Sequence, residues 1–287
     1  MVKIILVILA IVIVFFLIVM IADGNRFVIK KYKLISDKTR NPHRFVVLAD
    51  LHGKEYGKQN EKLLSAIDET KPDAILIAGD MLAAKKGKKF QHVLRFLNEL
   101  EKKYPIYYGN GNHEYRLKLY PETYGDMGKD YGDGLTKIGI STLCNESTKI
   151  EGEHIVIYGL EMDKKYYKRG RKIRMEKSYL DETIGTPDNK QYNILLAHNP
   201  AYFETYAKWG ADLVVSGHYH GGIMRLPLVG GVIAPSLALF PKYSGGLYTA
   251  GEKEKSVMVL SNGLGSHTLP VRIFNPGQLV VIELECE

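Results

Sequence analysis

Cysteine and tryptophan are scarce in this chain of 287 residues, which contains two cysteines and one tryptophan. Cys144 and Cys286 stand at unrelated spacings, which excludes both a disulfide-rich scaffold and a zinc site built from cysteines. The sequence also lacks internal repeats and low-complexity segments. What remains is an ordinary globular composition, with 45% apolar and 25% charged residues. The net charge of +7 indicates an anionic partner, but it does not choose between nucleic acid, membrane and phosphate compounds.

Long apolar runs are rare as well, and the only one covers residues 4–22. A helix of that length nearly spans a hydrocarbon core of roughly 30 Å. A cleaved signal peptide would have a shorter apolar region and a small-x-small cleavage site, and Met20-Ile21-Ala22-Asp23-Gly24 offers only a poor one. We therefore predict an uncleaved membrane anchor in residues 1–23. More basic residues follow the run than precede it, which favours a cytoplasmic domain, although long domains often escape this rule.

Residues 24–44 are predicted to form a juxtamembrane linker with an edge strand, and residues 45–287 a single catalytic domain. Apolar runs at 45–49, 74–78 and 106–108 indicate buried strands, and residues 58–70 and 93–100 have helical spacing. This alternation predicts an α/β (α+β) layered fold. Further strands are predicted at 154–158, 193–197 and 212–215, and a second sheet that contains residues 256–260 and 278–284. Residues 115–133 are predicted to be a loop.

Polar side chains follow five of these strands directly. Ligands of α/β folds gather at the carboxyl ends of strands, so we expect these side chains to lie together. On an extended backbone Asp50 and His52 would point to the same side. Oxygen and imidazole ligands without thiolates suit Mn²⁺, Fe or Zn²⁺, and their number suits two metals rather than one. The candidate residues are Asp50, His52, Asp80, Asn112, His113, His198, His218 and His220.

The order of these motifs resembles a known family. Asp50-x-His52, Gly79-Asp80, Gly111-Asn112-His113-Glu114, His198 and Gly217-His218-x-His220 resemble the signature of the calcineurin-like metallophosphoesterases, from about residue 45 to residue 222. The tail resembles the membrane-anchored bacterial branch of that family, through Arg225-Leu226-Pro227, Leu239-Phe240-Pro241-Lys242-Tyr243 and Gly263-Leu264-Gly265. The resemblance implies a β-sandwich flanked by helices, in four α-β-β-α layers, and slightly favours an extracytoplasmic catalytic domain.

The resemblance also implies a role for each residue. Asp50, His52, Asp80 and His220 would hold one metal ion, and Asp80, Asn112, His198 and His218 the other, so that Asp80 bridges the two. Mn²⁺ is the first choice, with Fe or Zn²⁺ as alternatives. His113 would donate to the phosphoryl or leaving oxygen, as a general acid or electrostatically. Two cations lower the pKa of a shared water toward roughly 7, so hydroxide would be available to attack phosphorus in line.

Residues in three other places keep two interpretations each. Arg225 is predicted to bind the substrate phosphate, or else to be structural. Glu114 and Arg116 would reach substrate or, as we favour, form a local ion pair. Residues 237–240 are apolar and would belong to the core or to a membrane interface.

The sequence therefore predicts a single-pass membrane protein whose catalytic domain hydrolyses a phosphodiester or pyrophosphate of a membrane-proximal or lipid-linked substrate. The alternatives are a broad phosphomonoesterase and a metal-binding membrane scaffold that does not hydrolyse. A nucleic-acid role is motivated by the net charge and the basic run at 164–177, but that run lacks a recognisable nucleic-acid module. No protein partner is inferred.

Overall fold

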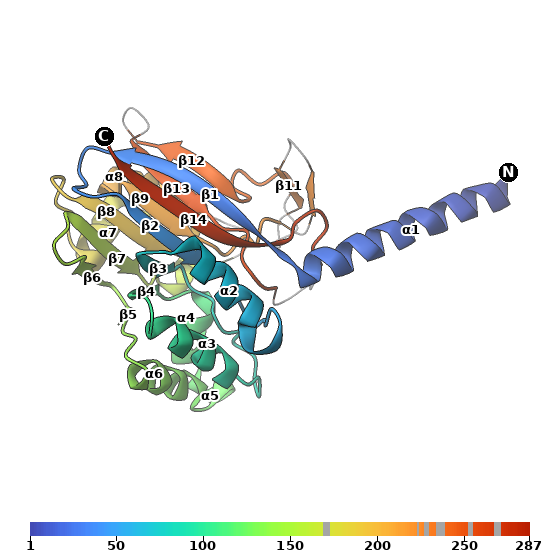
Figure 1. The fold of residues 1–287 in the computed structure, drawn as a ribbon, viewed down its shortest axis with the longest axis horizontal. Helices are drawn as coiled ribbons and strands as arrows, with labels where there is room; N and C mark the ends of the chain where they lie inside the picture. The colour runs from blue at the N-terminus through green and yellow to red at the C-terminus, as the bar shows by residue number, and fades with distance from the viewer. Residues whose placement is uncertain (169–172, 223, 227–229, 234–238, 252–254, 267–270) are drawn as a thin grey trace.

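The computed structural model describes residues 1–168, 173–222, 224–226, 230–233, 239–251, 255–266 and 271–287. Pro227, residues 237–238 and residues 169–172 of the basic run lie outside these ranges. Within them the chain forms two six-stranded sheets, a two-stranded sheet and helices on the outer faces (Figure 1).

The amino-terminal helix α1 (Val2–Asn25) projects away from the body of the molecule (Figure 1). Its length and composition would let it cross a membrane, and the same properties would fit a signal sequence. Strand β1 (Phe27–Ser36) follows at once and pairs in parallel with β14 (Gly277–Cys286) along its whole length. Residues 27–36 are therefore an edge strand of the first sheet.

The first sheet has the order β1-β14-β2-β3-β4-β5, and its remaining strands are β2 (His43–Leu48), β3 (Ala74–Ile77), β4 (Ile106–Gly109) and β5 (Thr142–Leu143). The second sheet has the order β12-β13-β9-β8-β7-β6, with strands β6 (Glu146–Lys149), β7 (Ile155–Leu160), β8 (Tyr192–Ala197), β9 (Leu213–Ser216), β12 (Gly246–Ala250) and β13 (Ser256–Leu260). Strands β10 (Met224–Leu226) and β11 (Gly230–Ile233) form the small antiparallel sheet.

Helices cover the outer face of each large sheet. The first sheet carries α2 (Glu61–Thr70), α3 (Gln91–Glu101), α4 (Asn112–Leu119), α5 (Pro121–Tyr124) and α6 (Met127–Lys137). The second carries α7 (Lys177–Ile184) and α8 (Phe203–Trp209). Short 3₁₀ turns lie at Lys58–Asn60, Lys164–Tyr167 and Pro200–Tyr202.

Both faces of the central strands are covered, which explains their continuous apolar runs. On β2, Phe45 and Val47 face the second sheet, whereas Val46 and Leu48 face the helices. Strand β8 repeats this alternation, because Ile194 and Leu196 pack between the sheets while Leu195 and Ala197 pack against helices. The predicted four-layer α-β-β-α arrangement is confirmed.

Two predictions about elements were wrong. Residues 278–284 belong to the first sheet, where β14 lies between β1 and β2, because a strand's apolar pattern does not specify its sheet. Residues 115–133 are largely helical rather than a loop. Three glycines weaken the helical signal of α6, but Met127, Tyr131 and Leu135 form a buried face on the core, and this packing outweighs propensity.

Candidate metal centre

The candidate ligands leave the sheets through sharp left-handed turns. Strands β2, β3, β8 and β9 end at Leu48, Ile77, Ala197 and Ser216, one to four residues before the ligands that follow each of them. Five of these ligands have positive φ, a conformation that costs non-glycine residues about 1–3 kcal/mol each and is concentrated at functional sites. They are Asp50 (51°), His52 (49°), Asp80 (56°), His218 (71°) and His220 (51°).

This geometry corrects the reasoning that paired Asp50 with His52. Strand alternation is not what brings the two side chains together, since β2 has already ended at Leu48. They converge because left-handed turns redirect both side chains. Backbone hydrogen bonds fix these turns, as Asp50 N–H donates to Gly79 O and His52 N–H to Asp80 O, each at 3.0 Å.

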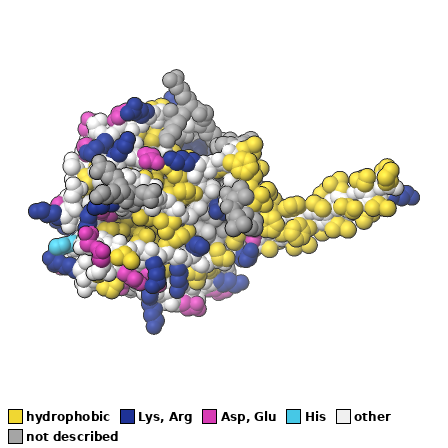
Figure 2. Space-filling view, turned by 90° about the horizontal axis from the view of Figure 1, so that it is seen from above, with side chains coloured by type: hydrophobic (Ala, Val, Ile, Leu, Met, Phe, Trp, Pro, Cys, Tyr) yellow, Lys and Arg dark blue, Asp and Glu magenta, His cyan; other side chains and the backbone are white. Residues whose placement is uncertain are grey.

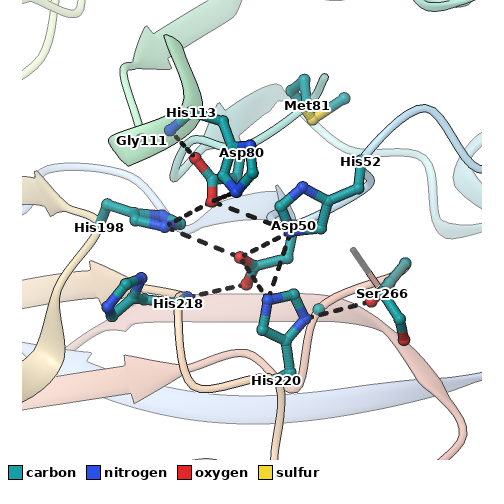
Figure 3. Close-up of polar contacts among 12 residues, drawn as sticks. Asp50, His52, Asp80, Met81, Gly111, His113, His198, His218, His220 and Ser266 are labelled. Atoms are coloured by element: carbon teal, nitrogen blue, oxygen red, sulfur yellow. Dashed lines mark hydrogen bonds and ion pairs between the residues drawn. The ribbon is translucent and has the colours of Figure 1, made fainter. Parts of the chain in front are cut away.

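The side chains meet at two carboxylate oxygens (Figure 3). Asp50 Oδ1 lies 3.5 Å from His220 Nε2, 3.7 Å from His52 Nε2 and 3.8 Å from His198 Nε2. Asp80 Oδ2 lies 3.2 Å from His198 Nε2 and 3.9 Å from His52 Nε2. Ligands held about 2.1 Å from one ion at 90–109° are roughly 3–3.4 Å apart, so these separations are close to those of a coordination shell.

The ligands form overlapping groups that share Asp80 and His52. One group of mutually close ligand atoms contains Asp50, His52 and His220, and another contains Asp80, His198 and His218. A third joins His52 and Asp80 with His113. Because Asp80 lies close to members of both of the first two groups, its position fits the bridging carboxylate that the family resemblance implies.

Backbone carbonyls orient two of the imidazoles. His198 Nδ1 lies 2.6 Å from Ala78 O and His220 Nδ1 lies 3.2 Å from Gly265 O. A carbonyl only accepts, so Nδ1 carries a proton in each ring, and in the neutral ring the lone pair of Nε2 is directed into the site. Metal-ligating histidines are typically held in this way.

Unsatisfied oxygen atoms show that the residues fit a cation. Asp50 Oδ1 and Asn112 Oδ1 are buried and accept no hydrogen bond from any residue that the structure describes. Asn112 stands between Gly111 and His113, which both approach the Asp80 carboxylate. Buried oxygens are seldom left without a partner, and a divalent ion would satisfy both.

His113 has the opposite arrangement. Its Nδ1 accepts a hydrogen bond from the backbone N–H of Ala84 at 2.7 Å, so in the neutral ring the proton is on Nε2. Nε2 lies 3.8 Å from Asp80 Oδ2 and faces the site (Figure 3). A protonated nitrogen donates rather than ligates, so we separate His113 from the ligands even though its ring lies among them.

Burial and neighbouring charges shift the pKa values of the ionisable side chains in the site in different directions. Burial raises the pKa of Asp50, and it lowers the pKa values of His113 and His218. Burial, followed by the charge of Arg272, lowers the pKa of His220 to about 3. Burial opposes charge on His198, but the Asp80 and Asp50 carboxylates and the Ala78 carbonyl together outweigh it and raise the pKa of His198 to about 10. Before metal binds, a proton on His198 therefore partly compensates the carboxylates.

Glu114 is a functional residue whose role the sequence did not reveal. The favoured ion pair with Arg116 is absent among the described contacts, because the buried Glu114 carboxylate instead accepts hydrogen bonds from the backbone N–H groups of Asp80, Met81 and Gly111 at 2.8–3.0 Å. It thereby fixes the turn that carries Asp80. Burial, and next the charge of Asp80, raises the pKa of Glu114.

Two residues from the carboxyl-terminal part of the chain stabilise the loops around the site through hydrogen bonds to backbone carbonyls. The buried guanidinium of Arg272 donates to the carbonyls of Asn262, Gly263, Gly265 and Asn275. Asn275 Nδ2 donates to the carbonyls of His220 and Gly222, each at 2.7 Å. Neither residue stands in a recognisable motif, so sequence reasoning had no signal for them.

Arg225 contacts the turn that follows the ligand His220. Its Nη1 donates to the carbonyls of Gly221 and Ser244, which ties the small β10–β11 sheet to the turn after His220. These contacts fit the structural interpretation, but they use only Nη1 and leave the N–H groups of Nη2 and Nε for other acceptors, so the contact with a substrate phosphate stays a prediction.

The fold and this centre together define a class of protein. The sequence profile of the calcineurin-like phosphoesterases matches residues 43–222, more than half of the chain. The chain belongs to that family, and it is a hydrolase acting on phosphoric ester bonds.

Individual relatives are distant but cover most of the chain. An uncharacterised metallophosphoesterase of Campylobacter jejuni is 27% identical over 84% of this chain and 59% of its own length. YpbG of Bacillus subtilis is 26% identical over 88% of this chain and 85% of its own length. The phosphodiesterase YaeI of Escherichia coli is 26% identical over 78% of this chain and 76% of its own length. This chain therefore spans less than two thirds of the first relative and most of the other two.

The close approach of Gly111 to Asp80 gives a test of the centre. A Cβ on Gly111 would lie 2.2 Å from Asp80 Oδ1, so Gly111→Ala must displace that carboxylate. We expect the purified variant to bind less metal, measured by elemental analysis. Gly132→Ala is the matched control, because a Cβ there meets nothing within 4 Å. Equal metal content in both variants would contradict the site.

Proposed function

We propose that the chain is a two-metal phosphoester hydrolase that acts on a phosphodiester or pyrophosphate of a membrane-proximal or lipid-linked substrate. Asp50, His52, Asp80 and His220 would hold one ion and Asp80, Asn112, His198 and His218 the other, with Mn²⁺ as the first choice. The observation that carries the proposal is the convergence of these donors from both sheets on two buried carboxylates. The intact donor set argues against a scaffold that does not hydrolyse.

When bound, two divalent ions supply Lewis-acid charge that neutralises phosphoryl oxygens and makes water a stronger acid. The chain's own residues do the rest. Asp50 and Asp80 provide the negative charge that holds the cations. The carbonyls of Ala78 and Gly265 keep His198 and His220 in the tautomer that can ligate. His218 and His220 are partly exposed, so the centre is accessible to a substrate.

The tautomer of His113 refines its predicted role. Loss of the Nε2 proton from a neutral ring would leave an imidazolate, which is a very strong base. Protonation of Nδ1 would in turn break the contact with the Ala84 N–H. We therefore assign His113 as a hydrogen-bond donor that stabilises charge on a phosphoryl or leaving oxygen, rather than as a general acid.

A diester is favoured because the relative YaeI is named a phosphodiesterase. The membrane setting is supported by the junction between α1 and the body. Asp23 is 2% exposed, and its carboxylate accepts from Arg26 and from the backbone N–H of Asn275 at 2.7–3.0 Å. Asn275 in turn binds the carbonyl of His220. The end of the proposed anchor is thus two hydrogen bonds from a candidate metal ligand.

The full chain in detergent, stripped of metal and reloaded with Mn²⁺, tests the function. We expect metal-dependent hydrolysis of bis-para-nitrophenyl phosphate in preference to para-nitrophenyl phosphate. Asp80→Asn should abolish it because the bridging charge is lost, whereas Asp133→Asn on the exposed surface of α6 should not. Preference for the monoester would support the phosphomonoesterase alternative. Metal binding without turnover of either ester would support the scaffold.

The role of His113 is tested separately by His113→Asn. An asparagine oxygen can still accept from the Ala84 N–H, but the Nε2 donor is gone. We expect kcat for the diester to fall about 100- to 1000-fold, as for loss of one oxyanion donor. Metal content should stay at the wild-type value. A loss of metal that accompanies the loss of activity would show that His113 is a ligand instead.

A further inference from the structure

The surface beside α1 carries exposed apolar side chains that the metal centre does not use. Leu239 and Phe240 are 66% and 62% exposed, Phe274 is 40% exposed and Leu226 is 39% exposed. We call these four residues the apolar rim. Figure 2 shows apolar side chains continuing from the projecting helix onto the adjacent end of the body.

The rim is held together by short strand contacts. Met224 on β10 bridges Ile273, next to Phe274, and β10 pairs with β11. Ile233 at the end of β11 bridges Leu239, and Phe240 N–H donates to Val232 O at 2.9 Å. Phe274 and Phe240 therefore stand at opposite edges of one small sheet.

The contacts of Phe274 show which part of α1 lies beside the rim. Its ring centroid lies 6.3 Å from those of both Phe15 and Phe16. These two residues precede the end of the apolar run by about seven positions, or about 10 Å of helix. If α1 crosses a membrane, Phe274 is placed beside a part of the helix that lies within the hydrocarbon.

The backbone supports the same conclusion. Phe240 and Phe274 have φ of 47° and 52°, a left-handed conformation that is a genuine outlier for bulky residues. Costly backbone conformations are concentrated at functional sites, so two exposed phenylalanines in this conformation indicate that their side chains serve a contact. Large exposed apolar patches of this kind typically mark interaction surfaces.

We propose that the apolar rim is a second membrane contact, which inserts into the same bilayer as α1 and seats the metal centre at the level of the lipid head groups. A bilayer is favoured over a second copy of the chain because the rim is continuous with the helix that would already lie in lipid. The position of the metal centre is tied to that of the rim, since Asn275, adjacent to Phe274, donates a hydrogen bond to the carbonyl of His220. The proposal depends on α1 being retained as a span, and it does not depend on hydrolysis.

Quenching of tryptophan by brominated acyl chains tests this contact in the full chain, reconstituted in phosphatidylcholine nanodiscs. Phe240→Trp and Phe274→Trp report on the rim. Ile35→Trp is the matched control, because Ile35 is 69% exposed near the far end of β1, about 26 Å along the strand from Phe27. Phe16→Trp shows separately whether α1 lies in the bilayer. The emission of Trp209, which is buried, is subtracted using the parent chain.

We expect the rim tryptophans to lose emission in brominated lipid to a similar degree as Phe16→Trp, while Ile35→Trp keeps its emission. Rim tryptophans that behave like Ile35→Trp, in discs where Phe16→Trp is quenched, would overturn the proposal. Protection of the rim together with a dimer in each disc would assign the surface to a second copy instead. Leu239→Trp replaces either rim variant that does not fold, as judged by circular dichroism.

Discussion

Two buried carboxylates at the ends of neighbouring strands of the first sheet are the constraint on which this structure depends. Asp50 and Asp80 are almost fully buried, and charges removed from water must be compensated. Imidazole nitrogens approach both oxygens within 4 Å, and His198 holds a proton tightly because Asp80 lies beside it. Without cations this compensation is incomplete. The site is therefore built for metal, and a metal ion removes the cost that the fold otherwise bears.

The surrounding elements make sense as supports for that arrangement. Left-handed turns at five ligands need contacts that hold them, and the Glu114 carboxylate provides three hydrogen bonds for the Asp80 turn alone. Arg272 and Asn275 do the same from the carboxyl-terminal side. Because Asn275 also binds Asp23, the network that positions His220 reaches the end of α1. The geometry of the candidate metal centre and the attachment of α1 thus share one set of hydrogen bonds.

Much of the arrangement follows from sequence, because buried strands such as 45–49 and 74–78 are strongly apolar and each ends in a polar residue. The candidate ligands could be listed from the sequence, but not the reason that their side chains converge. Left-handed φ at Asp50 and His52 depends on hydrogen bonds to the next turn, which sequence does not encode locally. Strand β14 was assigned to the wrong sheet and α6 was missed, because pairing partners and packing faces are tertiary properties. Arg272 and Asn275 act through backbone carbonyls, so no motif marks them.

Calorimetric titration of the metal-free chain with Mn²⁺, repeated in buffers of different ionisation enthalpy, tests the central claim most directly. It yields the number of ions bound and the number of protons released. We expect two ions per chain and, at pH 7, net release of protons, because the Asp80 carboxylate raises the pKa of His198 and burial raises that of Asp50, and both groups must be deprotonated to bind metal. Binding of a single ion, or binding of two ions without proton release, would contradict the account of the site.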